Sequence, residues 1–204
     1  MNRKPGWWFL GFIMVTCTPA LSQEVPQTSN PVDSLFQRGN YEAGVSTGVL
    51  FSPILPDKGR PTVNYTLSGA QFGWMITDVN SSSWLPGNVE LLGETVGGTP
   101  FNGTGIYLVG GTAWIRYNFV EPNCRMIPYV QGGAGAELTD FDQRLIGEHF
   151  NFNLNLGAGM HCFVQRNLSI DIGCRFQHLS NARLSHTDIG VNAFGPELGV
   201  SYFF

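Results

Sequence analysis

Apolar residues occupy every second position over long stretches of this chain. The longest stretch runs from residue 150 to residue 164, where Phe, Leu, Ala, Met, Cys and Val alternate with Asn, Gly and His. A period of two places successive side chains on opposite faces of a β-strand. Strands in globular proteins are about 5 or 6 residues long, whereas a tilted membrane-spanning strand needs roughly 9–11 residues. The length of this alternation therefore favours a strand that crosses a membrane.

The same alternation predicts about eight strands in the chain. The next strand is predicted at residues 168–177, and the last one ends at Phe204. Earlier strands with less regular alternation are predicted at residues 41–51, 65–77, 88–95, 105–119 and 126–138. We therefore expect an all-β fold, an eight-stranded antiparallel transmembrane β-barrel, because an even number of long strands can close on itself. A soluble barrel of the lipocalin kind is the alternative.

The predicted connections alternate in length. Longer loops are expected near residues 52–63, 96–104, 139–149 and 179–191, and shorter turns near residues 120–125 and 165–167, with a longer turn at 78–87. Outer-membrane barrels have short periplasmic turns and longer external loops. Both ends of the barrel are therefore expected on the periplasmic side. The apolar alternation that ends on Phe204 resembles the C-terminal signature by which bacterial outer-membrane barrels are recognised for insertion.

The first 22 residues have the pattern of a secretory signal peptide. Arg3 and Lys4 precede a short apolar segment at residues 7–15, and Ala20-Leu21-Ser22 offers small residues for cleavage. Nine apolar residues are too few to cross roughly 30 Å of hydrocarbon as a helix. We therefore divide the chain into a signal peptide (1–22), a polar lead-in (23–40) and a barrel domain (41–204).

Composition excludes several classes of protein. Only 13% of the residues are charged, against about 25% in an average domain, yet 43% are hydrophobic and 15 are Phe. This is not the composition of a disordered chain. The net charge of -4 gives no basic surface for nucleic acid, and eight strands enclose a lumen too narrow for a porin channel. The few charges of the strands are expected to pair inside the barrel, namely Glu90, Glu94, Asp171, Arg175 and Glu197.

Three of the four cysteines lie outside the signal peptide, at positions 124, 162 and 174. Their spacing matches no metal or redox motif. Cys162 and Cys174 have the same parity on neighbouring predicted strands, so a disulfide between them stays open, although free thiols are favoured.

Polar residues interrupt the apolar face where the seventh predicted strand ends. His178 and Ser180 have the parity of the apolar residues 168–176 and are expected to point outward near the external rim. Asn192 on the last strand is expected across the hairpin from His178. A Ser hydroxyl becomes a nucleophile when a His base removes its proton and a third group fixes the His tautomer. The alternative is a polar rim at the lipid–water interface, where polar groups cost roughly 0–1 kcal/mol.

The string Phe-Gln-His-Leu-Ser-Asn-Ala at residues 176–182 resembles the lipid A 3-O-deacylase (PagL) family of outer-membrane esterases. The resemblance extends to residues 116–119 and 128–135. It implies an eight-stranded barrel with a lipid-facing Ser-His-acid site that hydrolyses the ester-linked acyl chain at the 3-position of lipid A. Lipid A of lipopolysaccharide is then the substrate, outer-membrane lipid surrounds the protein, and no cofactor or metal is required. Whether the chain forms a homodimer stays open.

The resemblance assigns roles to particular residues. Ser180 would be the nucleophile, His178 the general base, and Asn181 would support the oxyanion site. The third member would be Asn192, where the best-known members carry Glu, with Asp188 as an alternative acid. Arg183 stands where Gly is expected and would either obstruct the site or contact a lipid A phosphate. The alternative function is a non-catalytic structural or adhesive barrel, or a family member that has lost activity.

Overall fold

The structure is a computed structural model that describes residues 32–52, 62–81, 84–141, 146–185 and 189–204. The predicted signal peptide, residues 23–31 of the lead-in, and the alternative acid Asp188 lie outside the described residues. The three-part division of the chain therefore stays a prediction.

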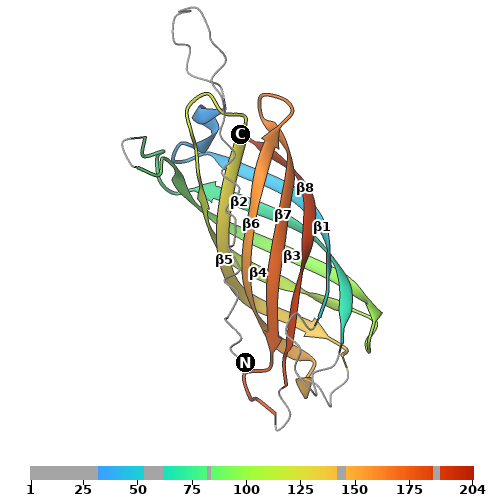
Figure 1. The fold of residues 1–204 in the computed structure, drawn as a ribbon. Helices are drawn as coiled ribbons and strands as arrows, with labels where there is room; N and C mark the ends of the chain where they lie inside the picture. The colour runs from blue at the N-terminus through green and yellow to red at the C-terminus, as the bar shows by residue number, and fades with distance from the viewer. Residues whose placement is uncertain (1–31, 53–61, 82–83, 142–145, 186–188) are drawn as a thin grey trace, which may run out of the picture.

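Eight antiparallel strands form a closed barrel in which each strand pairs with its neighbours in sequence and β1 pairs with β8 (Figure 1). This confirms the predicted fold class. The strands are β1 (Tyr41–Leu50), β2 (Asn64–Met75), β3 (Asn88–Asn102), β4 (Leu108–Asn118), β5 (Met126–Thr139), β6 (Phe150–Phe163), β7 (Leu168–Ser180) and β8 (Val191–Phe203).

The third strand is longer than the sequence pattern predicted. It was expected to end at Thr95, with a loop at residues 96–104, but β3 pairs with β2 as far as Asn102. Apolar alternation fades after Val96 because the next residues are Gly-Gly-Thr-Pro. Backbone pairing does not need alternation, and Gly98 suits the ladder because a Cβ there would clash with the Thr66 carbonyl oxygen. The prediction was therefore wrong at this boundary, and the loop is shorter.

The outer surface of the barrel is apolar. Leu154 and Leu156 on β6 are 57% and 63% exposed, while Asn153 and Asn155 between them are buried. The predicted division into an apolar outer face and a polar inner face is thus confirmed for this strand. Because these exposed side chains cannot be covered by the single chain, the surface suits contact with lipid.

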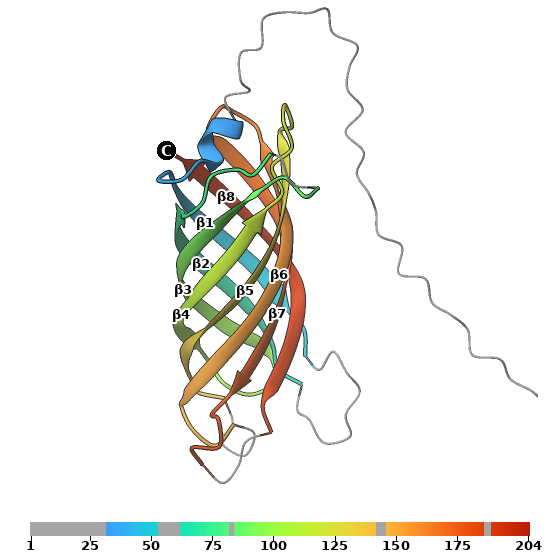
Figure 2. The same ribbon diagram turned by 90° about the vertical axis from the view of Figure 1, so that its left-hand side faces the viewer.

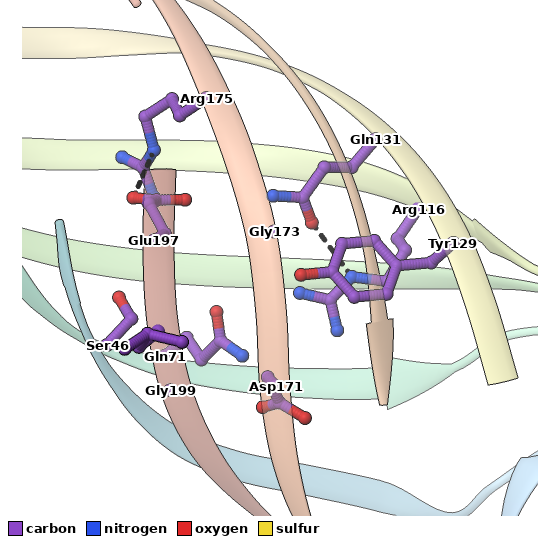
Figure 3. A pocket seen from close by; sticks show the side chains of 11 residues that line it. Ser46, Gln71, Arg116, Tyr129, Gln131, Asp171, Gly173, Arg175, Glu197 and Gly199 are labelled. Atoms are coloured by element: carbon purple, nitrogen blue, oxygen red, sulfur yellow. Dashed lines mark hydrogen bonds and ion pairs between the residues drawn. The ribbon is translucent and has the colours of Figure 1, made fainter. Parts of the chain in front are cut away.

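Buried ion pairs cross the lumen in two groups. In the first, Arg175 lies 2.6 Å from Glu94 and 2.8 Å from Glu197, and its guanidinium stands over the ring of Trp114. Figure 3 shows Arg175 and Glu197 at the edge of a small polar cavity. The predicted pairing of Arg175 with internal carboxylates is confirmed.

The second group surrounds Arg116. Its guanidinium lies 2.8 Å from Glu42 and 3.5 Å from Glu90. Beside it, His161 Nδ1 lies 2.7 Å from an oxygen of Asp171. Nε2 of His161 lies 3.4 Å from the Arg116 guanidinium, so the imidazole belongs to the same polar network. The pairing follows from the narrow lumen, which brings side chains of opposite strands within reach.

Apolar side chains close both ends of this polar interior. The short 3-10 helix η1 (Asp33–Phe36) lies at the end of the barrel that holds the C terminus (Figure 2). There the fully buried Phe36 packs against Phe203, with 5.2 Å between the ring centroids. The cluster at the opposite end comprises Leu50, Val63, Tyr65, Leu67, Val96, Leu108, Phe141, Ile146, Leu179, Val191 and Ala193. The described residues contain no helix long and apolar enough to cross a membrane.

Cys124, Cys162 and Cys174 are free thiols. Cys162 pairs with Ile170 across the β6–β7 ladder, whereas Cys174 pairs with Ala158. The two cysteines therefore stand at different levels of the hairpin, and no disulfide joins them.

Candidate functional site

The outer face of β7 turns polar at the end of the strand. Along this strand the side chains of Gln177 and Leu179 are buried, whereas His178 and Ser180 lie half-buried on the face that carries exposed Ile172. A hydrophilic pair is therefore placed on the outside of the barrel, as the parity argument predicted.

Apolar side chains of β6 border this pair. The ladder places Leu154 opposite His178 and Phe152 opposite Ser180, and both are well exposed on the outer face. On the other side His178 is paired with Asn192 of β8. An apolar chain bound beside Ser180 would cover these exposed side chains. Binding there is favourable because apolar surface is removed from water.

His178 and Asn192 are hydrogen-bonded. Nδ1 of the imidazole lies 2.6 Å from Oδ1 of the amide. Since an amide oxygen only accepts, Nδ1 carries the hydrogen and Nε2 has the free lone pair that a general base needs. The amide therefore fixes the tautomer and the orientation of the ring.

Ser180 is placed beside this base by the strand itself. Two residues of strand separate its Cα from that of His178 by roughly 7 Å on the same face. Among the described residues, the Ser180 hydroxyl makes no hydrogen bond. Catalytic hydrogen bonds are often formed only when substrate is bound. The imidazole of His178 and the hydroxyl of Ser180 lie on the same outer face of β7, where such a bond can form.

Asn181 points into the barrel and is fully buried. Its Nδ2 donates to the carbonyl oxygen of Ile146 and, at 3.3 Å, to the hydroxyl of Ser185, while its Oδ1 accepts from the N–H of Arg183 at 2.8 Å. These bonds link the loop after β7 to the loop before β6. The side chain therefore supports the turn and does not face the outer surface.

The turn after Ser180 has an uncommon backbone. Ala182 and Arg183 have φ of 52° and 64°, a left-handed conformation that costs a non-Gly residue on the order of 1–2 kcal/mol. The hydrogen bond from Arg183 N–H to Asn181 holds this geometry, which explains how Arg is accommodated where Gly was expected. The Arg183 side chain is exposed on the turn.

The family model for lipid A 3-O-deacylase (PagL) matches residues 60–201 of this barrel. This chain belongs to the PagL family. A search of curated proteins finds no match.

Solved structures show the same fold as this PagL-family barrel. The crystal structure of the outer membrane enzyme PagL superposes with a TM-score of 0.58 at 17% identity, covering 78% of this chain and 97% of that one. Neisserial surface protein A gives 0.56 at 15% identity, covering 80% and 96%. The N-terminal β-barrel domain of Pseudomonas aeruginosa OprF gives 0.50 at 19% identity, covering 82% and 98%. At these identities the likeness concerns the fold.

Sequence reasoning missed what lies behind the site in this PagL-family chain. Leu179, Val191 and Ala193 face inward and belong to the apolar cluster at this end of the lumen. Below them, Tyr65 donates its hydroxyl hydrogen to Gln177 at 2.6 Å. The apolar residues at inward positions 179, 191 and 193 were a visible signal, because they break the expected polar interior. This packing makes the wall that carries His178 and Asn192 rigid.

Proposed function

We propose that this chain is an outer-membrane serine esterase that removes the ester-linked 3-position acyl chain from lipid A. Membership of the lipid A 3-O-deacylase family supports the substrate. The observation that carries the mechanism is the hydrogen bond from His178 to Asn192 on the outer face. His178 is two residues from Ser180 on the same face of β7. No cofactor is needed for this chemistry.

The reaction follows from the roles of the three side chains. His178 Nε2 takes the proton of the Ser180 hydroxyl as its oxygen attacks the ester carbonyl carbon. The tetrahedral intermediate collapses when the 3-position oxygen leaves and takes that proton from His178. Lipid A with a free 3-hydroxyl departs at this step. Water, deprotonated by the same His178, then attacks the acyl-enzyme, and His178 returns the proton to the Ser180 oxygen as the fatty acid is released. Asn192 keeps the ring in place through both steps.

The backbone after Ser180 supplies the donor for the developing oxyanion. Arg183 N–H donates to Asn181 Oδ1, whereas Ala182 N–H donates to no acceptor in the described part of the chain. A fixed, unengaged N–H beside the nucleophile stabilises negative charge in the transition state. We assign this role to Ala182 N–H, with Asn181 holding the turn.

The site is proposed to lie near the outer-leaflet rim of the bacterial outer membrane. The connections after β1, β5 and β7 span residues 51–63, 140–149 and 181–190 at one end of the barrel. The turns at 119–125 and 164–167 at the end with the C terminus are shorter, whereas the turn at 76–87 is as long as these loops. Longer loops face outward in barrels of this class, which supports the external end as the position of Ser180. Arg183 on the adjoining turn is proposed to contact a lipid A phosphate through its planar guanidinium.

Mass spectrometry of lipid A tests this function. Cells that express the wild-type chain, Ser180→Ala or Ser68→Ala are compared. Ser68 is the matched control, because it is also a serine on the outer face, where its hydroxyl is hydrogen-bonded to that of Thr47. We expect loss of one 3-hydroxyacyl chain with wild type and Ser68→Ala only. Identical lipid A with wild type and Ser180→Ala would contradict the esterase and favour a structural or adhesive barrel.

A further inference from the structure

The pairing of β1 with β8, which closes the barrel, is interrupted at the end of the barrel where His178 lies. We call this pairing the closing seam and that end the site end. The register of the seam continues without a break as far as Gly48, which is paired with Glu197. Beyond this pair, the described residues of the two strands are joined by one isolated bridge, between Phe51 and Phe194. The seam therefore has a gap of two residues on each strand.

Pro196 lies in this gap and explains it. The N–H of Phe51 donates to the Phe194 carbonyl oxygen at 2.9 Å, and the N–H of Phe194 donates to the Phe51 carbonyl oxygen at 3.0 Å. The backbone groups of Phe194 thus point to β1, and every second residue of a strand points to the same neighbour. Pro196 therefore faces β1 opposite Val49. Since proline has no N–H, the Val49 carbonyl oxygen receives no ladder hydrogen bond there.

A close approach of the two strands replaces this bond only in part. A Cβ on Gly195 would overlap the Val49 carbonyl oxygen, so that this oxygen lies against the Cα of Gly195. A Cα–H is a weaker donor than an N–H. The gap is therefore the weak point of the seam, and a closed barrel has no free edge at which a proline would cost nothing.

The other half of the seam is fastened on both faces. In the lumen, the Ser201 hydroxyl donates to Glu42 Oε1 at 2.7 Å, from β8 to β1. On the outer face, the ring centroids of Tyr41 and Phe204 lie 5.9 Å apart, and the N–H of each residue donates to the carbonyl oxygen of the other. Separation of the strands there would break polar, aromatic and backbone contacts together.

The side chains behind the gap are apolar. Leu50, Val191 and Ala193 are buried in the cluster that closes the site end. In a membrane their exposure costs little, because lipid tails are as apolar as these side chains. Opening the other half would bring the buried carboxylate of Glu42 to the lipid, which is costly. The lipid environment therefore favours opening at the site end only.

We propose that the closing seam opens sideways to the lipid at its site end, from Pro196 onward, while its other half stays closed. The hydrogen bond between His178 and Asn192 joins β7 to β8, so it remains intact when β1 separates from β8. This opening is a property of the barrel and does not depend on the proposed esterase activity.

Amide hydrogen exchange of the full barrel in detergent micelles tests the opening. In the wild-type chain, the amides of Phe51 and Phe194 should exchange at least about tenfold faster than those of Val45 and Val200, which are partners in the other half of the seam. Pro196→Val supplies the missing N–H. It should slow the exchange of Phe51 and Phe194 at least about tenfold and leave Val45 and Val200 unchanged.

Pro128→Val is the matched control, because Pro128 is also an exposed proline on the outer face but belongs to β5. It should leave all four amides unchanged. Equal exchange along the seam of the wild-type chain would overturn the inference. Unchanged exchange of Phe51 and Phe194 in Pro196→Val would overturn it as well.

Cysteine labelling detects the opening with Pro196 in place. A single cysteine is introduced as Ala193→Cys or as Val96→Cys, after the native cysteines 124, 162 and 174 are replaced by Ser. Both positions are buried in the same apolar cluster, but Val96 lies on β3, away from the seam. In lipid vesicles, an apolar maleimide should label Ala193→Cys at least about tenfold faster than Val96→Cys. Equal labelling, or none at either position, would reject the sideways opening.

Discussion

His178 Nδ1 lies 2.6 Å from Asn192 Oδ1 across the hairpin that joins β7 to β8. The two residues are direct partners in the ladder, so the strands fix their separation without help from a loop. The amide accepts a hydrogen bond as a carboxylate would, but it brings no negative charge to stabilise an imidazolium. The orientation of the base and its electrostatic support are therefore separable in this protein.

Replacing Asn192 tests that separation. Asn192→Ala removes the acceptor and frees the ring, and we expect kcat on lipid A to fall about 10²–10⁴-fold, as when a Ser-His triad loses its orienting group. Asn192→Glu keeps the acceptor, adds charge, and should raise kcat above wild type. Release of fatty acid from lipid A micelles measures both. Asn102→Glu, at the end of β3, controls for added charge, and an Asn192→Glu enzyme no faster than wild type would contradict the electrostatic argument.

Arg175 is predicted to be the most costly ion-pair residue to remove. It is 2% exposed and pairs with both Glu94 and Glu197. Arg175→Met leaves two buried carboxylates unpaired, and we expect the free energy of unfolding to fall by about 3–5 kcal/mol. Urea unfolding in detergent or lipid vesicles measures this loss.

Two further variants separate the charge from the packing of Arg175. The triple variant Arg175→Met, Glu94→Gln, Glu197→Gln should recover most of the stability, because no buried charge is then left without a partner. Arg166→Met, in the exposed turn before β7, should change the stability by less than about 0.5 kcal/mol. A triple variant as unstable as Arg175→Met would show that packing of the Arg side chain dominates.

Asp140 is predicted to make the contact between the β3–β4 and β5–β6 loops sensitive to acid. One carboxylate oxygen accepts the N–H groups of Ile106 at 2.7 Å and Tyr107 at 2.9 Å. Slight desolvation acts to raise the pKa of Asp140, but these N–H donors outweigh it and hold the pKa below its ordinary value of 3.8. The stabilisation is thus present above the ordinary pKa and is lost as the pH falls through the lowered one.

Hydrogen exchange of the two amides measures this dependence. The protection factors of Ile106 and Tyr107 should fall between about pH 6 and about pH 2, where the carboxylate takes up a proton. In Asp140→Asn the side chain does not titrate, so the protection should be lower at high pH and independent of pH. Equal protection at both ends of the range in the wild-type chain would contradict the role of the charge.

Much of the fold was readable from the period of the pattern. Alternate side chains of a strand must point to opposite faces, so residues 150–163 could be assigned to a long strand and divided into outer Leu154 and inner Asn155 without any tertiary contact. Where the alternation fades, at Gly97 and Gly98, this reasoning ended β3 too early. Backbone pairing with β2 continues there because the ladder depends on the partner strand and not on side-chain polarity.

The sequence by itself determined the eight long strands, the outward placement of His178 and Ser180, and the family to which they are similar. These features depend on the alternation of side chains along each strand and on the short motif at residues 176–182. Both can be read directly from the amino-acid sequence. Only the tertiary structure decided the partners. Barrel closure brings Arg116 to Glu42 and Arg175 to Glu94 across the lumen, and the hairpin brings Nδ1 of His178 to hydrogen-bond distance of the Asn192 amide, which the sequence only expected across the hairpin. Such contacts join residues far apart in sequence, or depend on register and on the direction of a turn, and no periodicity encodes them.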